Sequence, residues 1–129
     1  MGVGMPGSIW LDEFGCILND AFGTIPYLVG SALEKKEGWR DVDVRVLLSK
    51  EEWDRWQFGD PERVRSNSRW VAVVLAFSAL GQRMTSLPID FQPQLAEWAN
   101  AKFPRPRSAL GIAYLSRFRE VEPEVAARP

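Results

Sequence analysis

The sequence contains no histidine and a single cysteine, Cys16. These absences exclude an internal disulfide, a zinc site built from cysteine and histidine, and every catalytic dyad or triad that uses an imidazole. Any chemistry must therefore come from carboxylates, hydroxyls, amines and guanidiniums. Cys16 falls in the apolar stripe of a predicted helix, and we expect it to be a small core residue rather than a nucleophile.

The chain also lacks a strong net charge and a long apolar run. Sixteen basic and seventeen acidic residues nearly cancel, so no overall field points to a nucleic-acid or membrane-surface partner. No apolar stretch approaches the length of a membrane span, and the opening MGVGMPGS lacks the basic and apolar regions of a signal peptide. We therefore expect one compact domain that is cytoplasmic and does not contact a membrane.

What the sequence does contain is a succession of helical and strand-like patterns. In chain order they predict a helix over 8–22, a strand over 25–29, a short helix or loop over 31–38, a strand over 41–48, a short helix over 51–57, a long buried helix over 68–84, a strand over 88–92, a helix over 93–103 and a helix near 110–118. This order predicts an α/β (α+β) fold, with a small mixed sheet, helices packed on one face and an open face opposite.

The same patterns divide the chain into four parts. We expect a flexible N-terminus over 1–7, a main domain over 8–103, a helical extension over 104–118 and a disordered tail over 119–129. No internal repeat is present.

Acidic residues occupy one face of two predicted strands. Residues two apart in a strand point the same way, so Asp41, Asp43 and Arg45 share one face while the intervening valines share the other. The stretch PIDFQ places Asp90 on the polar face of its own strand. If both strands bury their apolar faces in one core, the three aspartates gather on the open face. Such a cluster is costly unless a cation neutralises it, and oxygen-only ligands favour Mg²⁺ or Mn²⁺. Alternatively, Arg45 forms a structural salt bridge that neutralises the aspartates without a metal.

These residues carry a family resemblance. Val29-Gly30-Ser31, a spacer over 32–40, and then Asp41-Val42-Asp43-Val44 resemble the signature of the polymerase-β-like nucleotidyltransferase superfamily, minimal nucleotidyltransferase type, and Ile89-Asp90-Phe91 resembles its third acidic position. The resemblance covers about residues 8 to 102. It implies a nucleotidyltransferase fold in which Gly30 and Ser31 contact the triphosphate, Asp41 and Asp43 hold the metals, and Asp90 completes the site at the second metal or the acceptor hydroxyl.

The loop between the two motifs departs from the family pattern. Many members carry an arginine shortly after the Gly-Ser and a serine before the first aspartate, where this chain has Lys35 and Lys36 in the loop and Arg40 before Asp41. These three basic residues could bind the nucleotide or belong to a solvated charged loop. Trp39 could stack on a base or pack in the core. An RNA acceptor could also be met by five arginines that could otherwise simply face solvent, which are Arg63, Arg65, Arg69, Arg105 and Arg107.

The resemblance implies an enzyme that transfers a nucleoside monophosphate from a nucleoside triphosphate to a protein or RNA hydroxyl and releases pyrophosphate. It also suggests a HEPN-type protein partner in a toxin–antitoxin module. The alternatives are a catalytically silent module of the same fold that binds nucleotide or a protein partner, and a structural or interaction protein whose acids are only surface groups.

Overall fold

The computed structural model describes residues 7–34 and 40–111. Its elements follow the order α1 (Gly7–Phe22), β1 (Pro26–Val29), α2 (Ser31–Glu34), β2 (Val42–Leu48), α3 (Lys50–Trp56), a 3-10 helix η1 (Pro61–Ser66), α4 (Ser68–Thr85), β3 (Ile89–Leu95), α5 (Ala96–Lys102) and β4 (Ser108–Ala109). The predicted α/β class with a small mixed sheet is confirmed. Within the described ranges, no helix combines the length and the apolar character needed to cross a bilayer.

The sheet has the strand order β3-β2-β1-β4. The strand β2 runs parallel to β3 and antiparallel to β1, and β4 pairs antiparallel with β1 on the far side. The parallel pairing places Asp43 opposite Asp90, and the antiparallel pairing places Val29 opposite Asp43. The end of β1 and the starts of β2 and β3 therefore meet at one place in the sheet.

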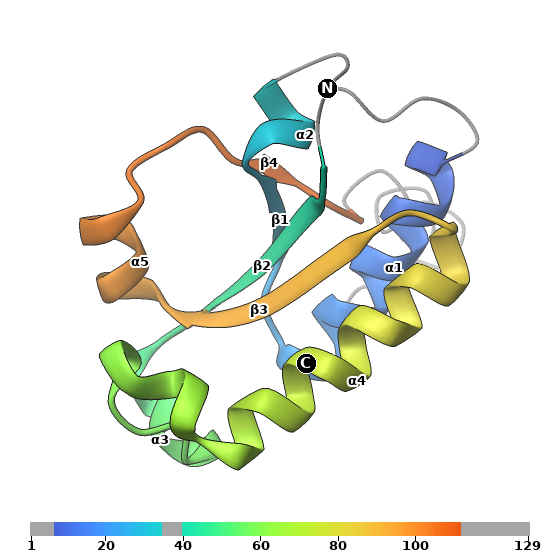
Figure 1. Cartoon of the computed structure of the whole chain (residues 1–129). Coiled ribbons are helices and arrows are strands. Elements are labelled where there is room, and N and C mark those ends of the chain that lie inside the picture. The colour runs from blue at the N-terminus through green and yellow to red at the C-terminus, as the bar shows by residue number, and fades with distance from the viewer. Residues whose placement is uncertain (1–6, 35–39, 112–129) are drawn as a thin grey trace, which may run out of the picture.

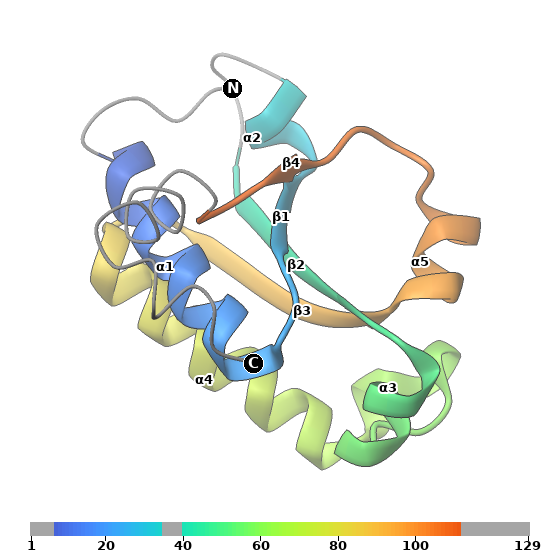
Figure 2. The same ribbon diagram turned by 180° about the vertical axis from the view of Figure 1, so that it is seen from behind.

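The two faces of the sheet differ because burial alternates along β2 and β3. The helices α1 and α4 lie together on one side, where they cover the buried face, whereas α5 and the segment that follows it lie on the other side (Figures 1 and 2). Phe91 of β3 packs its ring against Phe22 of α1 and Phe77 of α4. The core is therefore on the α1/α4 side, and the polar residues of both strands face the other side.

The strand β3 extends further than the sequence predicts, and the predicted helix start at Pro93 is wrong. Pro93 is buried inside β3, and α5 begins only at Ala96. Proline has no N–H to donate to a neighbouring strand, but β3 is an edge strand, where this donor is not needed. The Pro93 carbonyl accepts a hydrogen bond from Trp70 Nε1 at 3.0 Å, so α4 supplies a partner that a second strand would otherwise provide.

The segment after α5 returns to the sheet. The short strand β4 pairs with β1, and the Gly111 N–H donates to the Asp12 carboxylate of α1 at 2.9 Å. Gly15 of α1 permits this docking because a Cβ there would lie 2.6 Å from the Leu110 Cβ. Residues 104–111, which the sequence assigned to a helical extension, thus contain a strand, while 112–118, the tail over 119–129 and the first six residues lie outside the described part of the chain.

Candidate functional site

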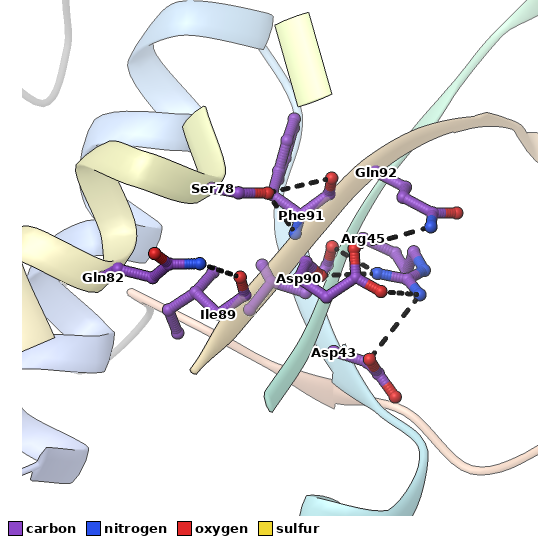
Figure 3. A network of polar contacts seen from close by, with 9 residues as sticks. Asp43, Arg45, Ser78, Gln82, Ile89, Asp90, Phe91 and Gln92 are labelled. Atoms are coloured by element: carbon purple, nitrogen blue, oxygen red, sulfur yellow. Dashed lines mark hydrogen bonds and ion pairs between the residues drawn. The ribbon is translucent and has the colours of Figure 1, made fainter. Parts of the chain in front are cut away.

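The candidate site lies where Asp43 and Asp90 stand side by side on the open face of the sheet. Both side chains project from the face opposite to the core, and in Figure 3 a dashed line joins each carboxylate to the Arg45 guanidinium. Three side chains of α4 hold β3 in this register by bonding to its backbone. Ser78 Oγ accepts from the Phe91 N–H at 2.9 Å, Gln82 Nε2 donates to the Ile89 carbonyl at 3.0 Å, and Trp70 binds the Pro93 carbonyl. The position of Asp90 is therefore fixed from the core side.

Gly30, directly after β1, is the third residue of the site. It follows β1 with φ +75°, and a Cβ at this position would collide with Oδ2 of Asp43. Glycine adopts this conformation at low cost and leaves the backbone in contact with the carboxylate. A ligand that approaches the Gly30 backbone would consequently also approach Asp43.

Arg45 ties the two carboxylates together. Its Nη2 lies 3.8 Å from Asp43 Oδ1 and 3.6 Å from Asp90 Oδ2. Its Nη1 donates to the backbone carbonyls of Asp90 at 2.7 Å and Val44 at 3.1 Å. The Arg45 side chain is only 13% exposed, so its positive charge is held between the two aspartates rather than in solvent. The structural salt bridge that the sequence left as an alternative is therefore present.

Burial and the neighbouring charges both shift the pKa values of Asp43 and Arg45. Burial raises the pKa of Asp43 above its ordinary value, Arg45 lowers it, and the neighbouring Asp90 and Asp41 raise it again. Burial likewise lowers the pKa of Arg45, and the aspartates oppose that shift. The negative charge on Asp43 is thus only partly compensated, which leaves the site able to gain from an additional cation.

The donor set suits a magnesium ion that is shared with a substrate. Asp41 precedes β2 and is exposed, and among the described residues no group of three or more His, Cys, Asp or Glu side chains could hold a metal ion. The structure therefore brings together a pair, Asp43 and Asp90, rather than the expected three acids. Magnesium is commonly bound through one or two carboxylates plus substrate phosphates, and this pair fits that arrangement.

A cavity of about 670 Å³ opens above the two aspartates. Its volume falls in the range usual for small-molecule sites. Asp43, Arg45 and Asp90 line it together with Gly30 and with a wall of basic and aromatic side chains, which are Arg65, Lys102, Phe103, Arg105 and Arg107. Sequence reasoning missed Lys102 and Phe103. The signal available was the dense run of basic residues and prolines over 102–107.

The other predicted site residues are distributed unevenly. Arg40 is exposed and is not among the described residues that line the cavity. Ser31 begins α2 directly after Gly30, while Lys35, Lys36 and Trp39 lie outside the described residues.

Cys16 is partly exposed rather than fully buried. Burial raises the pKa of its thiol, and the nearby charges of Asp20 and Glu13 raise it further. A raised pKa disfavours the thiolate, which is the nucleophilic form.

Comparison of this chain with protein-family models, with curated proteins and with solved structures finds no match. The resemblance drawn from the motifs therefore stays a prediction. A function for this protein must be argued from the geometry of the site itself.

Proposed function

We propose that this protein is a Mg²⁺-dependent nucleotidyltransferase. The observation that carries the proposal is the placement of Asp43 beside Asp90, in contact with Gly30, at the floor of a cavity with a basic wall. Paired carboxylates attract a divalent cation, and a basic wall attracts the phosphates that such a cation accompanies. A nucleoside triphosphate with its magnesium satisfies both requirements at once.

Each group in the site has a role in the proposed reaction. Asp43 and Asp90 would hold the ion, and Asp41, which precedes β2, would add a negative charge nearby. Bound there, magnesium would supply charge neutralisation and a polarised phosphate. Gly30 would let the phosphates approach the backbone. An acceptor hydroxyl oxygen forms a bond to the α-phosphorus, the bond from that phosphorus to the β-phosphate oxygen breaks, and pyrophosphate leaves. Asp90, the more exposed of the pair, takes up the hydroxyl proton.

The acceptor in this proposal is a hydroxyl of RNA or of a protein. A HEPN-type partner protein, in a toxin–antitoxin module, is part of the same proposal. Both elements come from the motif resemblance rather than from the cavity.

A label-transfer assay tests the proposal. Each of the four ribonucleoside triphosphates, labelled at the α-phosphate, is incubated with Mg²⁺ and with RNA or protein acceptors, and label transfer and pyrophosphate are measured. We expect Asp43→Asn and Asp90→Asn to reduce transfer at least about 100-fold, because losing a metal ligand removes several kcal/mol of transition-state stabilisation. Asp41→Asn should reduce transfer less than either of these changes, because Asp41 is exposed and is not among the described residues that line the cavity.

Asp20→Asn is the matched control, because Asp20 is an exposed aspartate of α1 that does not line the cavity. This variant should transfer label as the wild type does. Transfer that continues in EDTA or in Asp43→Asn would contradict the proposal, as would the absence of transfer from every nucleotide to both classes of acceptor.

The ion pairs of Arg45 favour a second candidate function, which is nucleotide binding without transfer. The guanidinium already provides a cation between Asp43 and Asp90, so the site could accept a nucleotide without a metal. Nucleotide binding that is equal with and without Mg²⁺, together with no pyrophosphate release, would favour this candidate over the enzyme.

A further inference from the structure

The residues that line the cavity carry a net positive charge, whereas the sequence as a whole does not. The chain has a net charge of -1, yet five basic side chains and two carboxylates are among the described residues that line this cavity. Arg45 is engaged by the two aspartates, and Lys102 pairs with Glu62 at 3.2 Å. Arg65, Arg105 and Arg107 have no ion-pair partner anywhere in 7–34 or 40–111. The cavity is therefore suited to a ligand with several negative charges.

One aromatic side chain stands among these basic groups. Phe103 is 49% exposed, and within the described part of the chain it is the single aromatic residue that lines the cavity. Its ring packs edge-on against Trp98, with the centroids 5.4 Å apart, so the ring has a fixed support on one side. A half-exposed, supported ring in a basic cavity has the features of a stacking platform for a heteroaromatic base.

The segment that carries these groups is fixed at both ends. At the α5 end, Lys102 and Trp98 both bond to Glu62 of η1. At the other end, β4 pairs with β1 and the Leu110 N–H donates to the Pro26 carbonyl at 2.9 Å. The segment is therefore already ordered before a ligand enters the cavity. Binding does not have to supply the entropy cost of ordering it.

We propose that this wall recognises a nucleotide directly and without a metal ion, with Phe103 stacking on the base while Arg105 and Arg107 bind the phosphate chain. This inference rests on the proposed function only in taking a nucleotide as the ligand, and it assigns the base and phosphate contacts to the 103–107 segment. It predicts that the cavity prefers a nucleoside triphosphate to inorganic tripolyphosphate, since only the nucleotide has a base to stack.

The test is calorimetric titration in EDTA at low salt, with each ribonucleoside triphosphate and with tripolyphosphate as probes. In the wild type we expect at least one nucleotide to bind about tenfold more tightly than tripolyphosphate, which is the usual effect of one stacked base. Phe103→Ala should abolish this preference and leave tripolyphosphate binding unchanged. Phe103→Tyr keeps an aromatic ring and should retain the preference. Arg105→Gln combined with Arg107→Gln should weaken both ligands about tenfold or more.

The control variants separate this result from a general loss of charge or fold. Arg83→Gln removes an exposed arginine of α4 that does not line the cavity, and it should leave both ligands unaffected. The inference is overturned if no nucleotide binds in EDTA, if tripolyphosphate binds as tightly as every nucleotide, or if Phe103→Ala keeps the preference of the wild type. It is also overturned if Arg83→Gln weakens binding as much as the double variant.

The inference and the proposed function fail separately. Metal-free nucleotide binding that depends on Phe103, without any label transfer, would support the inference and contradict the enzyme. Transfer that depends on Asp43 but is indifferent to Phe103, Arg105 and Arg107 would support the enzyme and contradict the inference.

Discussion

At the scale of single residues, Gly30 shows how backbone geometry prepares the site. Its positive φ turns the chain at the end of β1, and the missing Cβ leaves room for the Asp43 carboxylate. Gly23 has nearly the same backbone conformation, with φ +70°, but a Cβ there would meet no atom within 4 Å. A comparison of substitutions at the two glycines therefore separates the free-energy cost of the backbone conformation from the cost of the contact with Asp43.

We expect Gly30→Ala to lower the free energy of unfolding by roughly 2–3 kcal/mol and Gly23→Ala by only about 1 kcal/mol. Both variants place a Cβ in the left-handed region, and only Gly30→Ala adds a collision with Asp43. Urea denaturation of both variants measures the difference. Equal losses would show that the close approach of Gly30 to Asp43 is unimportant.

The raised pKa of Asp43 makes stability depend on pH. The native state binds this proton more tightly than the unfolded chain does, so the free energy of unfolding falls as the pH rises from the ordinary value of 3.8 through the raised value. Below 3.8 Asp43 is protonated in both states and the effect disappears. Asp43→Asn removes this dependence, and Arg45 keeps its contacts with Asp90.

In metal-free buffer, Asp43→Asn should therefore become more stable relative to the wild type as the pH rises through this window. Above the window the difference should remain constant. Denaturation curves of Asp43→Asn and the wild type at a series of pH values measure this difference. A variant that loses stability relative to the wild type as the pH rises would contradict this reading of the site.

At the scale of elements, the pairing of β2 with β3 is held from both faces. On the core side, α4 satisfies the free edge of β3 through Ser78, Gln82 and Trp70. On the open side, Arg45 of β2 reaches across to the carboxylate and the carbonyl of Asp90. Arg45 is thus a structural link between the strands as well as a counterion.

Arg45→Met should destabilise the protein by about 2 kcal/mol at neutral pH, because two partly buried carboxylates lose their counterion. This value lies below that for a fully buried pair, since the Asp43 and Asp90 side chains remain 23% and 37% exposed. This loss of stability should shrink in acid as Asp43 is protonated. Arg55→Met is the control, because Arg55 forms exposed ion pairs on α3 and should change stability by less than about 0.5 kcal/mol. A loss for Arg45→Met that is small, or that does not depend on pH, would show that the guanidinium does not neutralise the pair.

Strand alternation made one part of the site predictable. The valines of β2 and the PIDFQ pattern place Asp43 and Asp90 on the polar faces of their strands. The residue-by-residue register could not be read in the same way, because it depends on side chains of α4 that bond to β3. Pro93 misled the prediction because a proline at a helix start and a proline in an edge strand have the same local pattern.

The basic wall was less accessible to sequence reasoning. Arg105 and Arg107 belong to the run of basic residues and prolines over 102–107, but that run fits a solvated loop as well as a cavity wall. Their role follows from a long-range event, the return of the chain to pair β4 with β1, and two paired residues are too few to give a strand pattern.

At the scale of the whole molecule, the net charge is small, but acidic and basic side chains are separated within one cavity. A chain with a net charge of -1 places its acid pair at the base of one cavity, and the wall carries arginines that have no ion-pair partner among the residues that the structure describes. This separation suits a ligand that brings both a divalent cation and a phosphate chain. We therefore expect the affinity for such a ligand to fall as salt is raised, since exposed cations are screened at high ionic strength.

The most direct test of this account is the effect of Mg²⁺ on nucleotide affinity, measured by calorimetric titration of each ribonucleoside triphosphate with Mg²⁺ and with EDTA. For the wild type we predict that Mg²⁺ tightens the binding of at least one triphosphate about tenfold or more, because Asp43 and Asp90 would hold the ion that accompanies the phosphates. Asp43→Asn should keep the affinity measured in EDTA and lose the gain from Mg²⁺. Equal affinities with and without Mg²⁺ in the wild type, or a full Mg²⁺ effect in Asp43→Asn, would contradict the assignment of this pair as the metal site.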